Sequence, residues 1–489
     1  MEIATLIEQV QELRGDRIDT LDVMRLGLSI DTYRQGEVWD ALQVQNREQG
    51  ESLHLGMILK NKIGAYPIDG SDKDFAFSKR MADSLELGLG GFPEAWAIPS
   101  ISVVRSYDFR AKNPRTSPED VVVMVRELAG AIRAEAGLHW HRIRYMPQGE
   151  VYSDTPEDTI EFVFNLFEKN PDMPALMVFA VEGVNMAGAL SSHGDKIIGR
   201  GTGPRQPGEL TNAMVTLIFA RPERMDWLRP FAKYTKVNGA PLYPGFSGWK
   251  REPKHAFHPT PFFPQPWTER GIEQWDQMKV LARIHRPVTV PLLDPEKPGR
   301  RLRSEDVSTA LAKGWQQATM EIVPQPSRVF FDGGNAHQPL SEIMPALRVA
   351  GSRLDLLDSD ESYDLMARLG DTGAASPFVG IALATMASYT NADTSVVMPM
   401  RRDDQATIFT ITSATPGRPP KDNVFGVNLL PQTASSDEPS ASIVNKLKAE
   451  HRALAPPEPY IGPSSEEIEA ARKVFDAWLA EFPEEPNPG

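Results

Sequence analysis

The sequence predicts an α/β fold, with two α/β domains whose mixed or mostly parallel sheets are flanked by helices. Two short, unbroken apolar runs, Ala175–Val181 and Ala213–Ala220, carry most of this prediction. A strand with one wet face would alternate apolar and polar residues, so these runs indicate strands covered on both faces. Because they lie close in the sequence, we expect them to be neighbours in one sheet. Helix and strand patterns also alternate along the chain, as in sheets with crossover connections.

Two matching helix starts support this alternation in the first half. They are Ser117-Pro118-Glu119-Asp120 and Thr155-Pro156-Glu157-Asp158. In each, a hydroxyl side chain is expected to cap the helix, proline fixes its first turn, and carboxylates face the positive end of the helix dipole. The elements expected here are helix 2–13, strand 20–30 (made imperfect by Gly27), a turn and short helix at 31–42, helix 71–87, helix 121–136, strand 139–145, helix 159–169, strands 175–181 and 213–220, and a helix from 221 to about 234.

The second half repeats the pattern after a change in composition. Residues 241–266 are rich in Pro, Gly, Phe and His, which predicts a domain boundary, and their aromatic content indicates an ordered strap. The predicted division is an N-terminal α/β domain (1–245), a connecting strap rich in proline and aromatics (246–268), and a C-terminal α/β domain with a short disordered tail (269–489). The elements expected after the strap are helix 269–284, strand 287–293, helix 304–320, strand 328–331, helix 374–388, strands 395–400 and 406–413, an exposed loop at 433–442 and helix 465–480.

The bulk composition excludes several classes of function. The 489-residue chain carries a net charge of -14, which argues against a nucleic-acid partner and against adsorption to anionic lipid. It contains no cysteine, so it has no disulfide and no thiolate chemistry. No apolar stretch reaches the ~18 residues of a membrane helix, and the N-terminus does not resemble a signal peptide. These features predict a soluble protein with no membrane insertion, located in the cytoplasm.

Two glycine-containing stretches invite comparison with known catalytic or binding loops. Gly188–Gly194 contains Ser191 and Ser192, but its glycines do not have the spacing of a hydrolase nucleophile elbow. Gly199–Arg205 resembles a phosphate-binding loop, yet the glycines lead into prolines instead of a helix. We therefore interpret both stretches as polar loops, the second as a candidate contact surface for a partner.

Two other patterns invite comparison with metal sites. His139 and His141 share one face of an expected strand, but no third ligand or supporting carboxylate follows at a matching spacing. Asp358–Glu361 begins like a calcium loop, but Tyr363 and Leu369 occupy the positions that need glycine and glutamate. An acidic helix start is the simpler interpretation of the second pattern. Neither pattern predicts a metal.

Two further features do not define a site by themselves. Asp332–His337 is a tight polar turn after an expected strand, a common place for catalytic groups. The strap aromatics could bind a partner, although packing over a domain junction is the commoner reason for such residues; they are Phe257, Phe262, Phe263 and Trp267. No catalytic, cofactor-binding or metal-binding residue is therefore predicted, and the partner-binding residues are unknown from sequence.

One stretch resembles a known family. Residues 26–42 contain Gly27, Asp31, Tyr33-Arg34-Gln35-Gly36, Trp39 and Ala41-Leu42. This spacing resembles the Gly-x-x-x-Asp-x-Tyr-Arg-Gln-Gly-x-x-Trp-x-Ala-Leu signature near the start of the type VI lipase adaptor proteins. The resemblance covers mainly residues 20–235. Some relatives carry an N-terminal membrane segment, which this sequence does not show.

The resemblance implies a non-enzymatic role. Such proteins act as adaptors or chaperones that bind a toxic phospholipase effector in the cytoplasm and target it to the tip protein of the type VI secretion spike. The family offers no cofactor and no catalytic residue. The alternative is an α/β enzyme, hydrolase-like, with a diverged active site. An enzyme should show a deep pocket with converging polar groups and shifted pKa values, and an adaptor should show broad, shallow patches.

Overall fold

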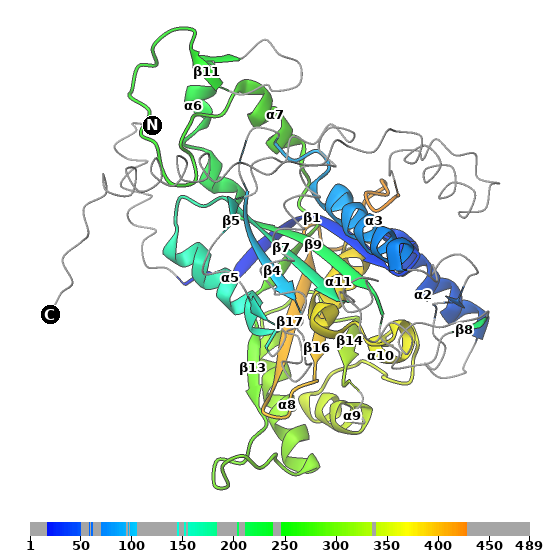
Figure 1. Cartoon of the computed structure of the whole chain (residues 1–489). Coiled ribbons are helices and arrows are strands. Elements are labelled where there is room, and N and C mark those ends of the chain that lie inside the picture. Colours follow the sequence, from blue (N-terminus) through cyan, green and yellow to red (C-terminus); the bar gives the residue numbers. More distant parts are fainter. Residues whose placement is uncertain are drawn as a thin grey trace, which may run out of the picture. The chain divides into compact units, whose positions relative to one another are not determined.

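A mixed sheet of 13 strands organises the part of the chain that the computed structural model describes. The strand order is β15-β14-β16-β17-β12-β1-β9-β7-β4-β5, with β13 beside β17, β2 beside β1 and β6 beside β4 (Figure 1). The described residues are 17–49, 58, 60–61, 70–93, 96, 98–104, 144–145, 151–152, 155–182, 203–204, 211–237, 246–334 and 339–427. The strands of this sheet are β1 (Thr20–Ile30), β2 (Tyr33–Arg34), β4 (Pro99–Val104), β5 (Arg144–Tyr145), β6 (Val151–Tyr152), β7 (Ala175–Glu182), β9 (Ala213–Ala220), β12 (Ala282–His285), β13 (Val288–Pro291), β14 (Arg328–Asp332), β15 (Ser362–Asp364), β16 (Thr394–Pro399) and β17 (Gln405–Ser413).

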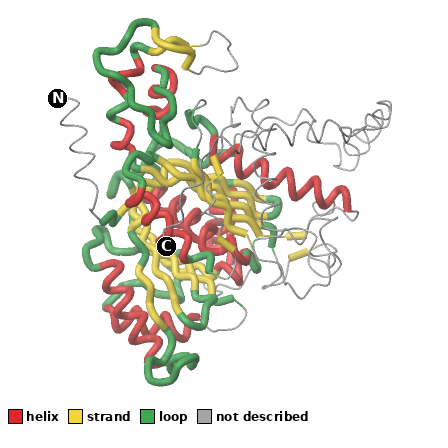
Figure 2. The backbone as a smooth tube through the Cα atoms, turned by 60° about the vertical axis from the view of Figure 1, so that its left-hand side comes forward, coloured by secondary structure: helices red, strands yellow, loops and turns green. Residues whose placement is uncertain are grey.

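Both flanks of the sheet are parallel and its centre is antiparallel. β14 pairs in parallel with β15 and β16, and β4 pairs in parallel with β5, β6 and β7. Between the flanks, each neighbouring pair from β16 to β7 runs antiparallel. Helices lie against the sheet in both views (Figure 2). The predicted fold class, α/β with a mixed sheet flanked by helices, is confirmed.

The two apolar runs that carried the prediction are β7 and β9. Every residue of both strands is buried, and the strands are direct neighbours, as expected. They pair antiparallel, with Val178 opposite Leu217, although strands covered on both faces are typical of parallel sheets. The unbroken apolar run therefore indicates that both faces of the strand are buried. It does not indicate the direction of the strand.

Helices bury the sheet from two sides. The helices are α2 (Gly36–Gln49), α3 (Gly70–Leu89), α5 (Asp158–Lys169), α6 (Arg229–Ala232), α7 (Glu269–Gln277), α8 (Ser304–Thr319), α9 (Pro339–Ala350), α10 (Leu365–Leu369) and α11 (Ser376–Asn391), with 3-10 turns η2 (Pro222–Met225) and η3 (Gly373–Ala375). On β14, Val329 and Phe331 join a core under α8 and α9, while Phe330 joins the larger core that contains α11. Alternate residues of one strand thus face the two helical layers.

Close backbone contact fixes α3 on the sheet. A Cβ at Gly27 would lie 1.9 Å from the main-chain oxygen of Ser84, and a Cβ at Gly88 would lie 2.6 Å from Thr216. The Ser84 hydroxyl also donates to the Gly27 carbonyl at 3.1 Å. The glycine that makes β1 imperfect by pattern is therefore required by the approach of α3.

Several predicted elements differ from the structure. The helix expected over 269–284 ends at Gln277, and residues 282–285 form β12, which lies between β1 and β17. The helix expected from 221 to 234 is broken into η2 and the single turn α6. Thr155 does not cap α5 as predicted, because its backbone carbonyl accepts from Asp158 N at 3.1 Å and the helix has no side-chain cap. The helix α9 was not predicted.

Other predictions fall outside the described residues. These are helix 2–13, helix 121–136, most of strand 139–145, the loop 433–442 and helix 465–480. The division into domains at 246–268 stays a prediction.

A small lobe lies at the top of Figure 1, around α6 and β11. We define the basic lobe as residues 229–267, of which 238–245 are not described. It contains α6 and a two-stranded antiparallel sheet of β10 (Thr235–Val237) and β11 (Phe246–Trp249). Its remaining residues, 250–267, run as an irregular segment with several bends back to α7.

Candidate functional site

The signature stretch forms a turn whose side chains are used inside the fold. Asp31 and Gln35 adopt φ angles of 52° and 47°, which bend the chain between β1 and α2. The Gln35 side chain accepts from Leu28 N at 3.0 Å and donates to the Leu26 carbonyl at 2.7 Å. One buried amide thus satisfies two main-chain groups of the preceding strand. The structure of the turn therefore accounts for the glutamine in the signature.

A buried ion group surrounds the same turn. Arg34 Nε lies 2.8 Å from Asp83 Oδ2, and Lys79 Nζ lies 2.7 Å from Asp83 Oδ1. Arg80 Nη2 lies 3.5 Å from Asp31 Oδ1. The Asp31 and Asp83 side chains are 0% and 4% exposed. Removing one partner would leave a buried charge, so the Arg34–Asp83 and Arg80–Asp31 pairs hold α3 to the turn.

Trp39 joins the signature to the second half of the chain. Its ring centroid lies 6.0 Å from that of Phe330 and 5.4 Å from that of Tyr363. Phe330 and Tyr363 stack on each other at 4.7 Å, and Gln43 Nε2 donates to the Tyr363 hydroxyl at 2.8 Å. The residues of the signature therefore connect the two halves of the chain. They are not arranged as a catalytic site.

A second polar group lies at the carboxyl ends of β14 and β16. Asp332 is 1% exposed and accepts hydrogen bonds from the Ser376 hydroxyl, from Arg401 Nε at 2.6 Å and from Gly334 N at 2.8 Å. Arg401 Nη1 also reaches Asp371 Oδ1 at 2.7 Å. The predicted polar turn at 332–337 thus begins with a carboxylate that is fully engaged by its neighbours, and residues 335–338 are not described.

Asp364 lies next to this group. Burial raises the pKa of Asp364 to about 6, and the negative charge of Asp332 acts in the same direction. Its side chain accepts from Ala367 N at 3.0 Å and caps α10. A carboxylate with a raised pKa is a feature of catalytic acids, but the hydrogen bond to the helix end gives this group a structural role.

Most of the other sequence motifs lie outside the residues that the structure describes. Gly188–Gly194, His139 and His141 lie outside the described residues. Of the glycine-rich loop 199–208, only β8 (Gly203–Pro204) is described, and it pairs with β3 (Lys60–Asn61). No group of three potential metal ligands occurs among the residues that the structure describes.

The acidic stretch 358–361 does not begin a helix as interpreted from sequence. Asp358 Oδ1 accepts from Asp360 N at 2.8 Å, and Glu361 Oε2 accepts from Asp355 N at 2.7 Å. These carboxylates therefore close a turn that leads into β15. The helix that follows, α10, starts later and is capped by Asp364.

The strap aromatics divide into two groups. Phe262, Phe263 and Trp267 are buried, and Trp96 stacks on Phe263 at 5.8 Å while its Nε1 donates to the Phe262 carbonyl at 2.8 Å. Phe257 is half-buried and stacks on Trp227 at 5.9 Å. The first three serve packing, and Phe257 faces a cavity.

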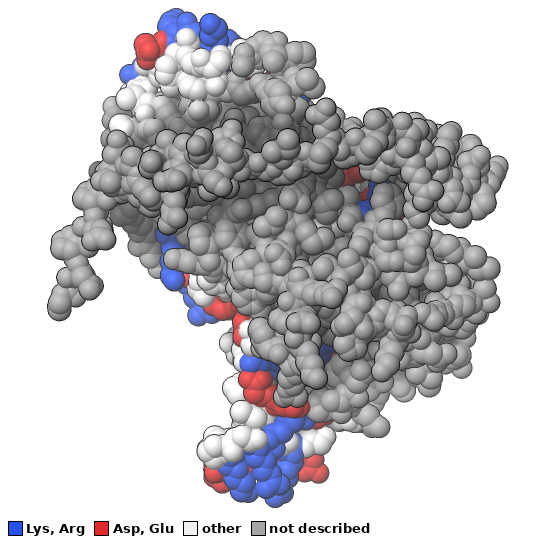
Figure 3. Space-filling view, viewed as in Figure 1, with Lys and Arg blue, Asp and Glu red and all other residues white. Residues whose placement is uncertain are grey.

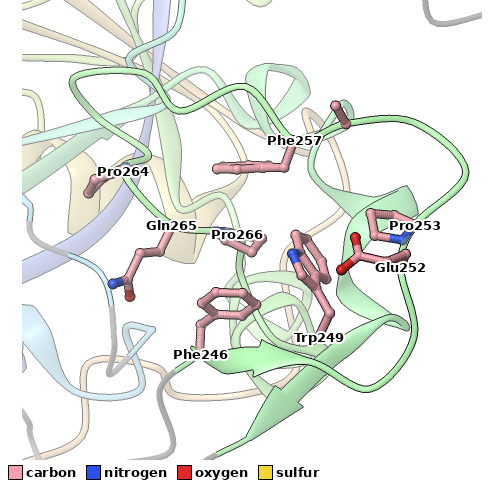
Figure 4. Close-up of a pocket in the computed structure, with 9 residues that line it drawn as sticks. Phe246, Trp249, Glu252, Pro253, Phe257, Pro264, Gln265 and Pro266 are labelled. Carbon is pink, nitrogen blue, oxygen red and sulfur yellow. The ribbon is translucent and has the colours of Figure 1, made fainter.

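This cavity is the candidate binding site. It has a volume of about 450 Å³ and lies between β11 and the irregular segment that follows. In Figure 4, Phe257 stands over it, opposite Phe246 and Trp249, while Glu252 lies at one side. The lining residues are Phe246, Trp249, Glu252, Pro253, Ala256, Phe257, Pro264, Gln265 and Pro266.

The cavity is lined mainly by aromatic rings and prolines. Glu252 is the one titratable side chain among the lining residues, and it is exposed. Trp249 and Phe246 meet edge to face at 5.0 Å, which gives the cavity an aromatic wall. Such a wall can pack against an aromatic or other apolar group of a partner. No helix among the described residues is long and apolar enough to cross a bilayer.

Two solved structures illustrate distant likenesses of the chain. The chain is similar to the oxazolomycin ketosynthase domain from Streptomyces albus, at 8% identity and a TM-score of 0.41, over 83% of this chain and 98% of that one. It is also similar to the ketosynthase from module 6 of the bacillaene synthase from Bacillus subtilis 168, at 10% identity and a TM-score of 0.44, over 95% of this chain and 85% of that one. Likenesses at these values carry no argument about function.

Family models give a direct assignment. The model described as type VI lipase adapter protein Tla3, N-terminal, matches residues 19–198, which include the signature turn. The model described as type VI lipase adapter protein Tla3, C-terminal, matches residues 281–413, which include β12 to β17. The two matches cover most of the chain and confirm the resemblance seen in residues 26–42. The chain therefore belongs to the type VI lipase adapter protein Tla3 family.

Proposed function

We propose that this chain is a non-catalytic adaptor that binds a phospholipase effector in the cytoplasm and targets it to the tip protein of the type VI secretion spike. The match of both adapter models, over 19–198 and 281–413, is the observation that carries the proposal. A lipase is the partner that the family description names. The spike component and the cytoplasmic site of assembly are the further steps of the proposal.

The polar groups of the fold support a non-catalytic role. Asp332, Ser376 and Arg401 are engaged with one another at the strand ends, and the signature residues are engaged within the turn. An active site needs a nucleophile or base aimed at a space where substrate can lie. The cavity between β11 and the following segment instead presents aromatic rings and proline.

Co-purification tests the proposal. The full chain carries an affinity tag and is purified from its native cells, and the proteins that elute with it through gel filtration are identified by mass spectrometry. We expect a lipase and a spike component, held through interfaces of roughly 800 Å² per partner. A tagged unrelated acidic protein of similar size from the same cells is the control.

One result of this experiment would contradict the adaptor proposal. If neither protein elutes with the chain and a small molecule is retained instead, the adaptor proposal is overturned. A diverged α/β enzyme then becomes the leading hypothesis. Assay of the purified chain for ester hydrolysis, with an Asp332→Asn variant beside it, would test that hypothesis directly.

A further inference from the structure

The basic lobe has a charge opposite to that of the whole protein. The chain has a net charge of -14. Within residues 229–267, the sequence contains one acidic residue, Glu252. The basic residues of the lobe are Arg229, Lys233, Lys236, Lys250, Arg251 and Lys254. Lys and Arg side chains gather at the top of Figure 3, over this lobe.

Most of these cations are not neutralised within the described part of the chain. Arg229 forms a bidentate pair with Asp276, at 2.7 Å for each contact. Lys250 lies 3.7 Å from Glu269, with both side chains more than half exposed. The other four basic residues have no ion pair among the described residues, so a positive field remains over the lobe. They are Lys233, Lys236, Arg251 and Lys254.

Two of these cations are held in place by an aromatic ring. Lys233 Nζ lies 5.3 Å from the centroid of the Tyr234 ring, and Arg251 Cζ lies 5.5 Å from the same centroid. The ring stabilises both charges without neutralising them. The contact favours these positions next to β10 and β11, which lowers the entropy lost when a partner binds.

The aromatic cavity adjoins these charges. Lys250, Arg251 and Lys254 follow closely on Trp249 and are interspersed in sequence with the cavity residues Glu252 and Pro253. The lobe thus combines a cavity of about 450 Å³, which has an aromatic wall, with a cationic border. An apolar anchor surrounded by charge of one sign is the pattern expected for a peptide that carries a large apolar side chain among charges of the other sign.

We propose that the basic lobe binds an acidic, extended protein segment that inserts one aromatic side chain into the cavity of Trp249 and Phe257. Carboxylates of the segment pair with the four basic residues that lack an ion pair within the described ranges. That the segment belongs to the lipase effector rests on the proposed function. An anionic membrane or nucleic acid fits less well, because a flat lipid surface or a phosphate backbone does not fill an aromatic cavity and the rest of the chain repels both.

Fluorescence anisotropy with a defined peptide tests the inference. The probe is a fluorescein-labelled peptide of about twelve residues, with Asp and Glu throughout and one central Trp. Two control peptides replace the Trp by Gly or the acidic residues by Asn and Gln. We expect the full chain to bind the probe about tenfold more tightly than either control, with an affinity that weakens as salt is added.

Three variants separate the charge from the cavity. Lys236→Glu with Lys254→Glu reverses two exposed charges, and Ala256→Trp fills the cavity from an exposed lining position without removing a contact. Each is expected to weaken probe binding by about tenfold. Lys297→Glu with Arg300→Glu, in the exposed loop before α8, makes the same charge change elsewhere and should leave binding unchanged.

The outcomes distinguish this inference from the proposed function. Equal binding of the probe by wild type and both lobe variants, or equal binding of the Gly control peptide, overturns the lobe as a site for an aromatic-anchored acidic segment. Tighter binding of duplex DNA or of vesicles containing anionic phospholipid than of the probe also overturns it. If lobe variants lose the probe but still co-purify the lipase, the site is correct and its assignment to the lipase is wrong. If wild type binds the probe but co-purifies no lipase, the site stands and the adaptor proposal fails.

Discussion

The signature turn and the basic lobe use charged and aromatic residues in opposite ways. In the turn, Asp31 and Asp83 are buried against arginine and lysine, and Trp39 packs on two other rings. In the lobe, cations face solvent and Trp249 and Phe257 are only half-buried. The residues that identify the family thus hold the fold together, while the residues available to a partner lie elsewhere. A family signature therefore need not mark a functional surface.

Replacing Trp39 by alanine gives the largest expected loss of stability. The ring packs against Phe330 and Tyr363 from the other half of the chain, so Trp39→Ala should lower the free energy of unfolding by about 3–5 kcal/mol. Urea unfolding followed by circular dichroism measures this. Trp249→Ala in the lobe is the comparison, and an equal loss there would remove the distinction between the two regions.

Asp364 makes the stability of the folded chain sensitive to pH. Its pKa is raised from 3.8 to about 6, so between these values the folded state holds more protons than the unfolded state. The free energy of unfolding therefore falls as the pH rises from about 4 to about 6, and it does not change further at higher pH. Asp364→Asn keeps the cap on α10 and should gain up to about 3 kcal/mol at a pH of about 7.5 but almost nothing at a pH of about 4. A gain that is the same at both pH values would show that the carboxylate is not the cause.

Gly27 tests the close contact between α3 and β1. A Cβ there would meet the main-chain oxygen of Ser84, which cannot move without shifting the helix. We expect Gly27→Ala to cost about 1–3 kcal/mol, as overpacking does elsewhere. Gly271→Ala is the matched control, because the nearest atom would be 3.7 Å from the new Cβ. Thermal unfolding of both variants decides whether contact or backbone freedom sets the cost.

Charge reversal in the lobe gives the smallest effect on stability. Lys236→Glu with Lys254→Glu alters exposed side chains without ion pairs among the described residues, so the free energy of unfolding should change by less than about 0.5 kcal/mol. The melting temperature measures this. A large loss would place these lysines with the structural residues and would count against the lobe as a binding surface.

Long buried elements could be predicted from sequence, whereas some short ones could not. β1, β7, β9, α8 and α11 lie close to their expected positions, because each carries a long or unbroken apolar pattern. β12 is only four residues long, and its sequence also fits the last turn of the helix predicted over 269–284. Its place between β1 and β17 depends on partners more than 100 residues away, which no local pattern reports.

The candidate site was only partly visible in the sequence. The sequence predicts an ordered strap whose aromatics either pack or bind a partner, and the structure divides these roles between Phe263 and Phe257. The cavity needs Phe246 from β11 and Pro264 from the far end of the strap, so it exists only after folding. The cluster of basic residues at 229–254 was present in the sequence, but the net charge of the whole chain concealed it.

The pairing of β1 with both β9 and β12 has a practical consequence for dividing the protein. A truncated chain that ends before β12 would leave residues 20–23 of β1 without their hydrogen-bonding partners at 282–285. An open edge on an apolar strand is a template for aggregation. Truncated forms made to map the lipase contact should therefore be insoluble alone, and the two halves produced together should restore each other's solubility as complementing fragments.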